Sequence, residues 1–311
     1  MPGVLRAVAV RLATSVLVLW AAVTISFCAL QATPGNVVDS LLGIGASATP
    51  EVRQQIIADY GLDRSLAVQY FAYLGKVLHG DLGYSYQLHE SVTSAIGGQL
   101  GASLELAGSG MLLAIVASTV LALLTAGRSR WVRSLSSGIE LVGVSIPVFW
   151  AGILLLTVFS FQLGWFPGVG DSSPAGLVLP AVSLAIPLTA LLTQVMREGL
   201  ERVLEEPFIL TAKSRGMTDR SVRFRHALRH ALLPVVTLAG GLFGALLGSM
   251  VVTERVFSRE GLGQLIINAV QSKDMPVVLG AVLCTATIYV VINIVLDLLY
   301  LVIDPRLRGA R

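Results

Sequence analysis

Residues 205–234 read EEPFILTAKSRGMTDRSVRFRHALRHALLP and separate two long apolar stretches of the chain. Pro207 follows two acids and suits the first turn of a helix, where its missing N–H costs no hydrogen bond and acids complement the helix dipole. Gly216 suits the end of that helix, and Thr218 or Asp219 can cap a second, arginine-rich helix. The segment therefore predicts two short helices between two apolar elements.

The composition around this segment is that of an integral membrane protein. Of the 311 residues 54% are hydrophobic and only 13% are charged, and the mean hydropathy is +0.77. Six apolar stretches are long enough to cross a bilayer as helices, which needs about 20 residues each, and none alternates like a barrel strand. We therefore expect an all-α polytopic membrane protein with six transmembrane helices. The expected spans are 12–31, 103–126, 137–162, 177–196, 231–252 and 276–303.

The basic residues predict the orientation of these spans. With a cytoplasmic amino terminus, sixteen of the 22 Lys and Arg residues fall in the segments that lie inside. The positive-inside rule therefore places both termini in the cytoplasm, a cap formed by residues 32–102 outside it, and the loop of residues 197–230 inside it. The net charge of +3 follows from this bias and does not indicate nucleic-acid binding.

The first span and the cysteines point to no other class of protein. The apolar run of the first span is longer than the roughly 7–15 residues of a signal peptide, and no small-x-small cleavage site follows, so we expect a retained helix. Cys28 and Cys284 fall inside predicted spans. They indicate small core residues rather than a disulfide framework or a metal site.

The outer segments carry their own helix signals. Thr49-Pro50 predicts a helix that ends near Gly61, and a second helix is expected over 66–78. The turn at residues 80–83 follows, so the cap should be ordered. A helix-like run at 264–270 in the third outer segment could re-enter the membrane or lie on its surface.

Three acids lie within the predicted spans, namely Glu105, Glu140 and Asp297. They could form an ion or proton relay, but buried acids are mostly paired, and we favour paired or hydrated carboxylates. Prolines at 147, 180 and 187 should kink the third and fourth spans.

A glycine stripe in the fifth span, Gly240, Gly244 and Gly248, lets another backbone approach closely. This stripe could serve packing within the chain, a seam with a second subunit or the wall of a pathway. The sequence leaves these alternatives open.

The loop at 205–234 has two possible roles, binding to lipid or docking of a partner protein. Basic amphipathic segments mostly lie on anionic lipid. The first short helix, however, is poor in basic charge, and the small side chains of Thr211, Ala212 and Ser214 would let a partner surface close around it. A lipid anchor would need bulky apolar groups there.

The string LTAKSRG at 210–216, with Leu233-Pro234 downstream, resembles the EAA loop of binding-protein-dependent ABC importer permeases. Leu210 replaces the Glu of the general motif and Thr211 replaces its first Ala. Both departures, and the string HALRHALLP at 226–234, are similar to the peptide-transport branch of that family. Further segments that resemble its B-type subunit are Gly61-Leu62-Asp63, Gly80-Asp81-Leu82-Gly83, Val256-Phe257-Ser258, Gly261-Leu262-Gly263, Asp297-Leu298-Leu299-Tyr300 and Asp304-Pro305-Arg306.

The resemblance implies a type I importer permease in which residues 1–311 form one transmembrane domain of a bacterial plasma membrane. It implies half of a translocation pathway for di- or oligopeptides or similar cargo. The implied partners are a second, homologous permease, two cytoplasmic ATPase subunits, an extracytoplasmic binding protein and the lipid bilayer. No cofactor is expected in this chain, with ATP and Mg on the ATPase subunits.

The resemblance also implies roles for individual residues. Asp81, Gly83 and Tyr84 would contact the binding protein, and the glycine stripe would serve packing or the pathway. A coupling helix would dock on the ATPase; its residues are Pro207, Phe208, Ile209, Leu210, Thr211, Ala212, Lys213, Ser214, Arg215 and Gly216.

Two other classes of membrane protein fit the sequence less well. An intramembrane enzyme needs a nucleophile, base or metal cluster near the bilayer, and Ser109, between two glycines, has no histidine in any predicted span. A secondary transporter usually has inverted repeats and ionisable groups in mid-membrane, and neither is evident. The sequence has no phosphate-binding GxxxxGK[ST] motif, so nucleotide chemistry is expected on another chain, and the permease subunit itself is not expected to be an enzyme.

Overall fold

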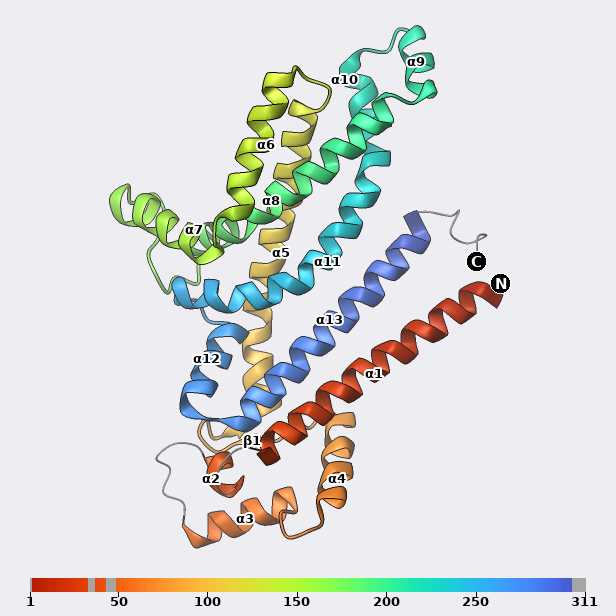
Figure 1. The fold of residues 1–311 in the computed structure, drawn as a ribbon. Coiled ribbons are helices and arrows are strands. Elements are labelled where there is room, and N and C mark those ends of the chain that lie inside the picture. Colours follow the sequence, from red (N-terminus) through yellow and green to blue (C-terminus); the bar gives the residue numbers. More distant parts are fainter. Residues whose placement is uncertain (1, 33–36, 43–48, 304–311) are drawn as a thin grey trace. The chain divides into compact units, whose positions relative to one another are not determined.

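The computed structural model describes residues 2–32, 37–42 and 49–303, and these are mainly helical (Figure 1). The long helices are α1 (Pro2–Ala32), α5 (Val92–Thr125), α8 (Pro174–Leu204), α11 (Leu228–Val256) and α13 (Met275–Ile303). The shorter ones are α2 (Val37–Leu42), α3 (Pro50–Tyr60), α4 (Leu66–Leu78), α6 (Arg130–Ser145), α7 (Val148–Leu155), α9 (Pro207–Ser214), α10 (Asp219–Val222) and α12 (Leu262–Ser272). Two π-helical stretches, η1 (Leu156–Gln162) and η2 (Arg223–Ala227), and two short strands, β1 (Tyr84–Ser85) and β2 (Glu90–Ser91), complete the described elements.

Helices occupy all six predicted spans. Among the described residues, five helices are long and apolar enough to cross a membrane, and the pair formed by α6 and α7–η1 counts as a sixth if it is one span. That pair bends by 98° at Pro147, which caps α7 in an extended conformation. The predicted kink at Pro147 is therefore confirmed, because proline cannot continue the hydrogen-bond ladder of the preceding helix. Helix α8 continues through Pro180 and Pro187.

The chain divides into two compact units. Unit 1 comprises Met1–Ser103 and Glu260–Arg311, and unit 2 comprises Leu104–Arg259. In unit 1, α1 lies along α13, α4 packs on α1 and α12 packs on α13 (Figure 1). In unit 2, α8 is central and packs against α11, α6 and α7.

The cap in unit 1 contains the helices that the sequence predicts. Helix α3 starts at Pro50 and ends before Gly61, whose φ of +60° is the left-handed conformation that favours glycine. Helix α4 covers the predicted residues 66–78. An apolar cluster joins the cap to the start of α13; its buried members are Val38, Leu41, Leu42, Ile56 and Leu279.

A small antiparallel hairpin pairs Tyr84 with Ser91 and Ser85 with Glu90. The Ser85 hydroxyl donates to the carboxylate of Asp274, which is 2% exposed and stands just before α13. The helix-like run expected at 264–270 lies within α12, which packs on α13 in unit 1.

Close backbone approaches hold α8 in unit 2. A methyl group at Gly143 in α6 would lie 3.1 Å from the Ala190 side chain, and one at Gly199 would lie 3.3 Å from the Ala231 backbone. Small residues at both crossings let the helices meet at short range. Helix α8 is therefore in close contact with neighbours on two sides.

Candidate coupling site

Helix α9 forms where the sequence places it. Pro207 is its first residue, and Gly216, with φ of +81°, follows its C-terminal turn. The N–H of Gly216 donates to the carbonyl of Lys213 over 2.9 Å. Thr218 then caps α10, because its hydroxyl accepts from the N–H of Ser221 at 3.3 Å.

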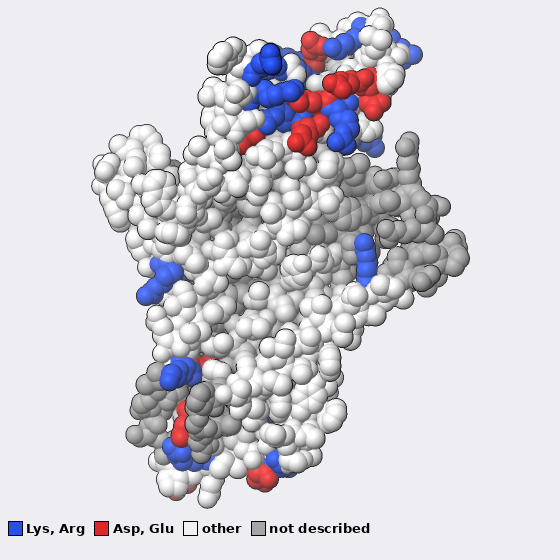
Figure 2. All heavy atoms as spheres, in the orientation of Figure 1, with Lys and Arg blue, Asp and Glu red and all other residues white. Residues whose placement is uncertain are grey.

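One buried side chain anchors α9 to the rest of unit 2. Ile209 is 2% exposed, whereas Leu210 is 70% and Phe208 is 41% exposed. The Phe208 ring lies 5.7 Å from the His230 ring, centroid to centroid. The helix therefore presents apolar side chains outward at an end of the unit where charged residues dominate (Figure 2).

The polar side chains of Thr211, Ser214 and Lys213 bond within α9 or to α10. The Thr211 hydroxyl donates to the carbonyl of Pro207 at 3.4 Å, and that of Ser214 donates to the carbonyl of Leu210 at 3.0 Å. Lys213 pairs with Asp219 of α10 over 2.9 Å. The hydrogen bond and charge of Lys213 lower the pKa of Asp219, so the acid stays ionised and ties α10 to α9.

A buried ion pair holds the C-terminal part of α8, the helix that precedes α9. Nη1 and Nη2 of Arg197 both donate to the Glu140 carboxylate in α6, and the Nη2 bond measures 2.8 Å. Ser136 donates to the same carboxylate at 2.6 Å and accepts from Arg197 at 2.9 Å, and Ser137 accepts from Arg197 at 3.2 Å. Glu140 is 3% and Arg197 is 7% exposed. This bidentate geometry clamps α6 to α8.

A second, more exposed pair lies one turn further along α8. Arg133 of α6 meets Glu201 of α8 at 2.7 Å, and the same carboxylate accepts from the N–H of Gly127 at 3.3 Å. With 31 residues, α8 is about 46 Å long and exceeds a hydrocarbon core of about 30 Å. Helix α8 is therefore longer than one crossing requires, and α9 follows its C-terminal end.

Arg197, the first residue of the predicted cytoplasmic loop of residues 197–230, lies within α8 and is buried. The preference for a paired Glu140 is confirmed, and Glu105 likewise meets Arg259, at 2.7 Å. The side chain of Asp297 lies outside the described side chains. An acid in the third predicted span and a base directly after the fourth were the available signal for the pair.

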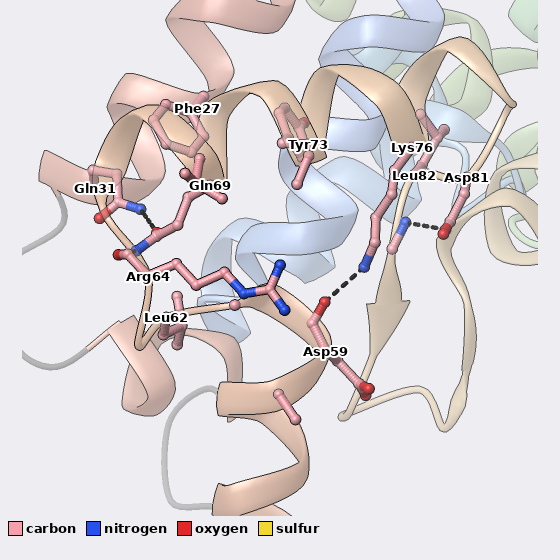
Figure 3. A pocket seen from close by; sticks show the side chains of 15 residues that line it. Phe27, Gln31, Asp59, Leu62, Arg64, Gln69, Tyr73, Lys76, Asp81 and Leu82 are labelled. Carbon is pink, nitrogen blue, oxygen red and sulfur yellow. Dashed lines mark hydrogen bonds between the residues drawn. The ribbon is translucent and has the colours of Figure 1, made fainter.

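The residues expected to contact a binding protein lie in the cap. Asp81 is exposed and accepts from the N–H of Gly83 at 2.9 Å, and Tyr84 is 41% exposed with its ring 5.2 Å from that of Tyr86. Asp81 and Gly83 also border a cavity of about 190 Å³ between α1, α3 and α4 (Figure 3). The part played by these residues stays a prediction.

Two cationic side chains line that cavity. Figure 3 shows Arg64 extending across it, while Lys76 donates to the carbonyl of Asp59 at 2.7 Å. Burial raises the pKa of Tyr73 on its wall to about 12. Gln69 is 8% exposed and accepts from the Gln31 amide at 3.0 Å.

The three glycines of the predicted stripe differ in exposure. Gly240 and Gly244 are half-buried, and the exposed face of α11 carries Gly241, Ala245 and Gly248. A methyl group at Gly241 or Gly248 would meet no atom within 4 Å. The role of the stripe stays a prediction.

Comparisons with known proteins agree with this geometry. Residues 110–309 match the family described as binding-protein-dependent transport system inner membrane component, and residues 4–107 match the N-terminal family of such membrane components. The chain belongs to this family. It is the permease subunit of an ABC importer and a multi-pass membrane protein.

Named relatives cover nearly the whole permease. A Brucella ovis protein with the provisional name of a peptide permease is 37% identical over 91% of this chain and 92% of its own. A Brucella abortus protein provisionally named as a peptide transport permease is 35% identical over 96% and 97%. The glutathione transport system permease protein GsiC of Escherichia coli O6:H1 is 35% identical over 85% and 87%.

A solved structure supports the type I importer fold of the permease. The MetNI methionine ABC transporter, in inward-facing conformations, has a chain that superposes with a TM-score of 0.55 at 19% identity, over 68% of this chain and 96% of that one. The predicted fold and the recognition of the family are therefore confirmed.

Proposed function

We propose that this permease forms half of the translocation pathway of a peptide importer and that α9 docks into a groove of a separate cytoplasmic ATPase. The observation that carries the proposal is α9 itself. It is anchored by Ile209, presents Leu210 outward and sits at the end of a clamped α8. Full burial of such an exposed leucine under a partner contributes about 1.5–3 kcal/mol to the free energy of binding.

The complete transporter would contain a second homologous permease, two ATPase subunits that hold ATP and Mg, and an extracytoplasmic binding protein. The family description supports a binding protein as partner and a location in an inner membrane. We infer that this membrane is the plasma membrane of a bacterium. The names of the relatives support peptides or peptide-like molecules such as glutathione as cargo. The binding protein would approach the cap near Asp81 and Tyr84.

Coupling would be mechanical. When the ATPases close, they displace α9, and the clamp between Arg197 and Glu140 makes α6 and α8 move together rather than bend separately. The close approach of Gly199 to Ala231 passes the motion to α11. Such rigid-body motion is a standard way to alternate access between two sides of a membrane.

Reconstitution tests the assignment. The complete transporter in liposomes should take up labelled peptide only with ATP and the binding protein, and the peptide-loaded binding protein should stimulate ATP hydrolysis. Liposomes that contain this chain alone should take up none. Uptake by the chain alone without ATP would refute the proposal.

A glycine replacement tests the docking helix. Gly216 has φ of +81° and open space around it, so Gly216→Val acts through the backbone, where a left-handed residue costs about 1–2 kcal/mol. We expect normal membrane insertion and an ATPase affinity reduced by about tenfold or more. Gly216→Asn should retain binding, since asparagine tolerates this conformation.

Gly164→Val is the matched control, because Gly164 has φ of +63°, open space around it and a place in a predicted outer loop. It should leave ATPase binding intact. Equal ATPase affinity of Gly216→Val and the unmodified chain would remove α9 from the docking site.

A further inference from the structure

A cleft of about 560 Å³ lies in unit 2 where the last turns of α5 meet α10 and η2. Its walls differ in chemistry. The residues of α5 are mainly apolar, and those of the following loop, α10 and η2 are mainly basic. The lining residues are Thr119, Val120, Leu123, Leu124, Arg128, Asp219, Arg220, Arg223 and Phe224.

Carbonyl groups at the end of α5 position two of the three guanidinium groups. Arg223 donates to the carbonyl of Leu123, and Arg128 donates to that of Leu124, both at 3.2 Å. Carbonyls in the last turn of a helix lack intrahelical partners and attract cations. Each bond uses one of the five N–H donors of an arginine, so further donors can bind a ligand.

The charge of the cleft is positive. Three arginines line it, and the acid among its lining residues, Asp219, is already paired with Lys213 at 2.9 Å. The charge of Arg223 also contributes to lowering the pKa of Asp219. An anion in the cleft would therefore meet free guanidinium donors with little competition from that carboxylate.

The apolar wall is open to its surroundings. Val120 is 50%, Leu124 is 58% and Phe224 is 61% exposed. Val120 and Leu124 belong to the membrane-spanning α5, and Phe224 projects from η2 beside the basic residues. The apolar surface thus continues from the candidate span to the charged loop, and we expect lipid headgroups at such an end of a span.

We propose that this cleft binds an anionic phospholipid of the cytoplasmic leaflet. The phosphodiester would be held by Arg128, Arg220 and Arg223, since guanidinium forks bind phosphate oxygens in pairs. Its acyl chains would run along Val120 and Leu124. The volume of the cleft falls within the roughly 300–1,000 Å³ of organic ligand sites, and its apolar wall suits a lipid rather than a free phosphate ion.

A bound lipid would bridge segments that are far apart in the sequence. The carbonyl of Leu123 and the side chain of Arg223 are 100 residues apart along the chain. The lipid would tie the end of α5 to η2, which leads into α11. No residue of α9 lines the cleft, although Lys213 of α9 pairs with the lining residue Asp219. Lipid binding and ATPase docking are therefore measured separately.

Native mass spectrometry of the detergent-solubilised transporter tests the site. The complex is titrated with phosphatidylglycerol, with phosphatidylcholine and with inorganic phosphate. We expect retention of phosphatidylglycerol over phosphatidylcholine and no displacement by phosphate. The variant Arg128→Gln/Arg220→Gln/Arg223→Gln should bind phosphatidylglycerol on the order of a hundredfold more weakly.

The matched control removes the same charge beside the cleft. Arg130→Gln/Arg225→Gln/Arg229→Gln changes three exposed arginines that do not line it. The control should stay within about threefold of the unmodified transporter, because separated surface charges are screened. Equal losses in both variants would reduce the effect to general surface charge and overturn the proposal.

A second variant covers the case in which the triple substitution fails to fold. Val120→Trp fills the exposed apolar wall and leaves every arginine in place. It should reduce phosphatidylglycerol retention and leave the complex assembled. Unchanged lipid binding in this variant, or displacement of the lipid by inorganic phosphate, would also overturn the proposal.

Discussion

Two buried acids, one in each unit, show how the partner of a carboxylate decides what it does. Glu140 in unit 2 is 3% exposed, and Asp274 in unit 1 is 2% exposed. Glu140 faces the guanidinium of Arg197 with two parallel hydrogen bonds. Asp274 accepts from the Ser85 hydroxyl and from the N–H of Val277, the latter at 3.4 Å.

The difference matches the work of the two regions. A full opposite charge on a second helix resists separation of α6 and α8, as the proposed mechanical coupling requires. Among the residues that the structure describes, Asp274 meets dipoles only, and burial raises its pKa despite the two hydrogen bonds. The Asp274 carboxyl links the hairpin to α13, and its raised pKa favours the protonated form more than in an exposed aspartate.

Breaking the charged pair should have the largest effect. Arg197→Met leaves Glu140 buried without its counter-charge, which costs about 3–5 kcal/mol of unfolding free energy. Arg133→Met is the control, because its pair with Glu201 is 55% and 23% exposed and such pairs contribute about 0–1 kcal/mol. Denaturant unfolding of the micelle-solubilised permease measures both.

The double variant Glu140→Leu/Arg197→Met sharpens the result. Removing both charges should restore most of the lost stability, since no uncompensated buried charge remains. A double variant as unstable as Arg197→Met alone would mean that the loss comes from packing and not from the ion pair.

Overpacking in unit 1 should cost less. A methyl group at Gly280 of α13 would lie 3.2 Å from the Ile96 side chain and closer still to Val92, which is fully buried. Gly280→Ala should therefore lower the unfolding free energy by about 1–3 kcal/mol. Thermal unfolding of the permease measures the change.

The control for this change has the opposite sign. Gly75→Ala in α4 meets open space and should stabilise the helix by about 0.5–1 kcal/mol. Equal effects of the two alanines would show that the apolar packing around Gly280 is looser than the structure describes.

Local signals in the sequence predict much of this architecture. Pro207 and Gly216 delimit α9, and Thr49-Pro50 and Gly61 delimit α3, because caps and left-handed residues act within one turn. The six spans follow from apolar length alone. Such features need no knowledge of what lies opposite them.

Features that depend on long-range contacts were not predictable in the same way. The pairing of Arg197 with Glu140 joins residues 57 apart, and only the packing of α6 on α8 brings them together. The exposure of glycines in α11 depends on neighbouring helices in the same way, and Gly241 is exposed whereas Gly240 is half-buried. The arginine cleft likewise depends on η2 lying beside the end of α5.

The smallest effect should come from Asp274→Asn and should depend on pH. Below the ordinary pKa of aspartate the group is protonated in both states and does not alter stability. As the pH rises, the unfolded chain ionises first because the folded pKa is raised by burial, so stability falls until the pH exceeds the folded value.

Asparagine cannot ionise, so the variant should lose this slope and be the more stable protein at neutral pH. The gain should stay below about 1.5 kcal/mol, because the asparagine oxygen can still accept from the Val277 N–H while its NH2 group donates to the Ser85 hydroxyl oxygen. Thermal unfolding between about pH 3 and pH 8 tests this, with Asp63→Asn, an exposed acid of the cap, as control. A variant that keeps the slope of the unmodified protein would show that Asp274 ionises as freely as an exposed acid, and the contrast with Glu140 would then rest on geometry alone.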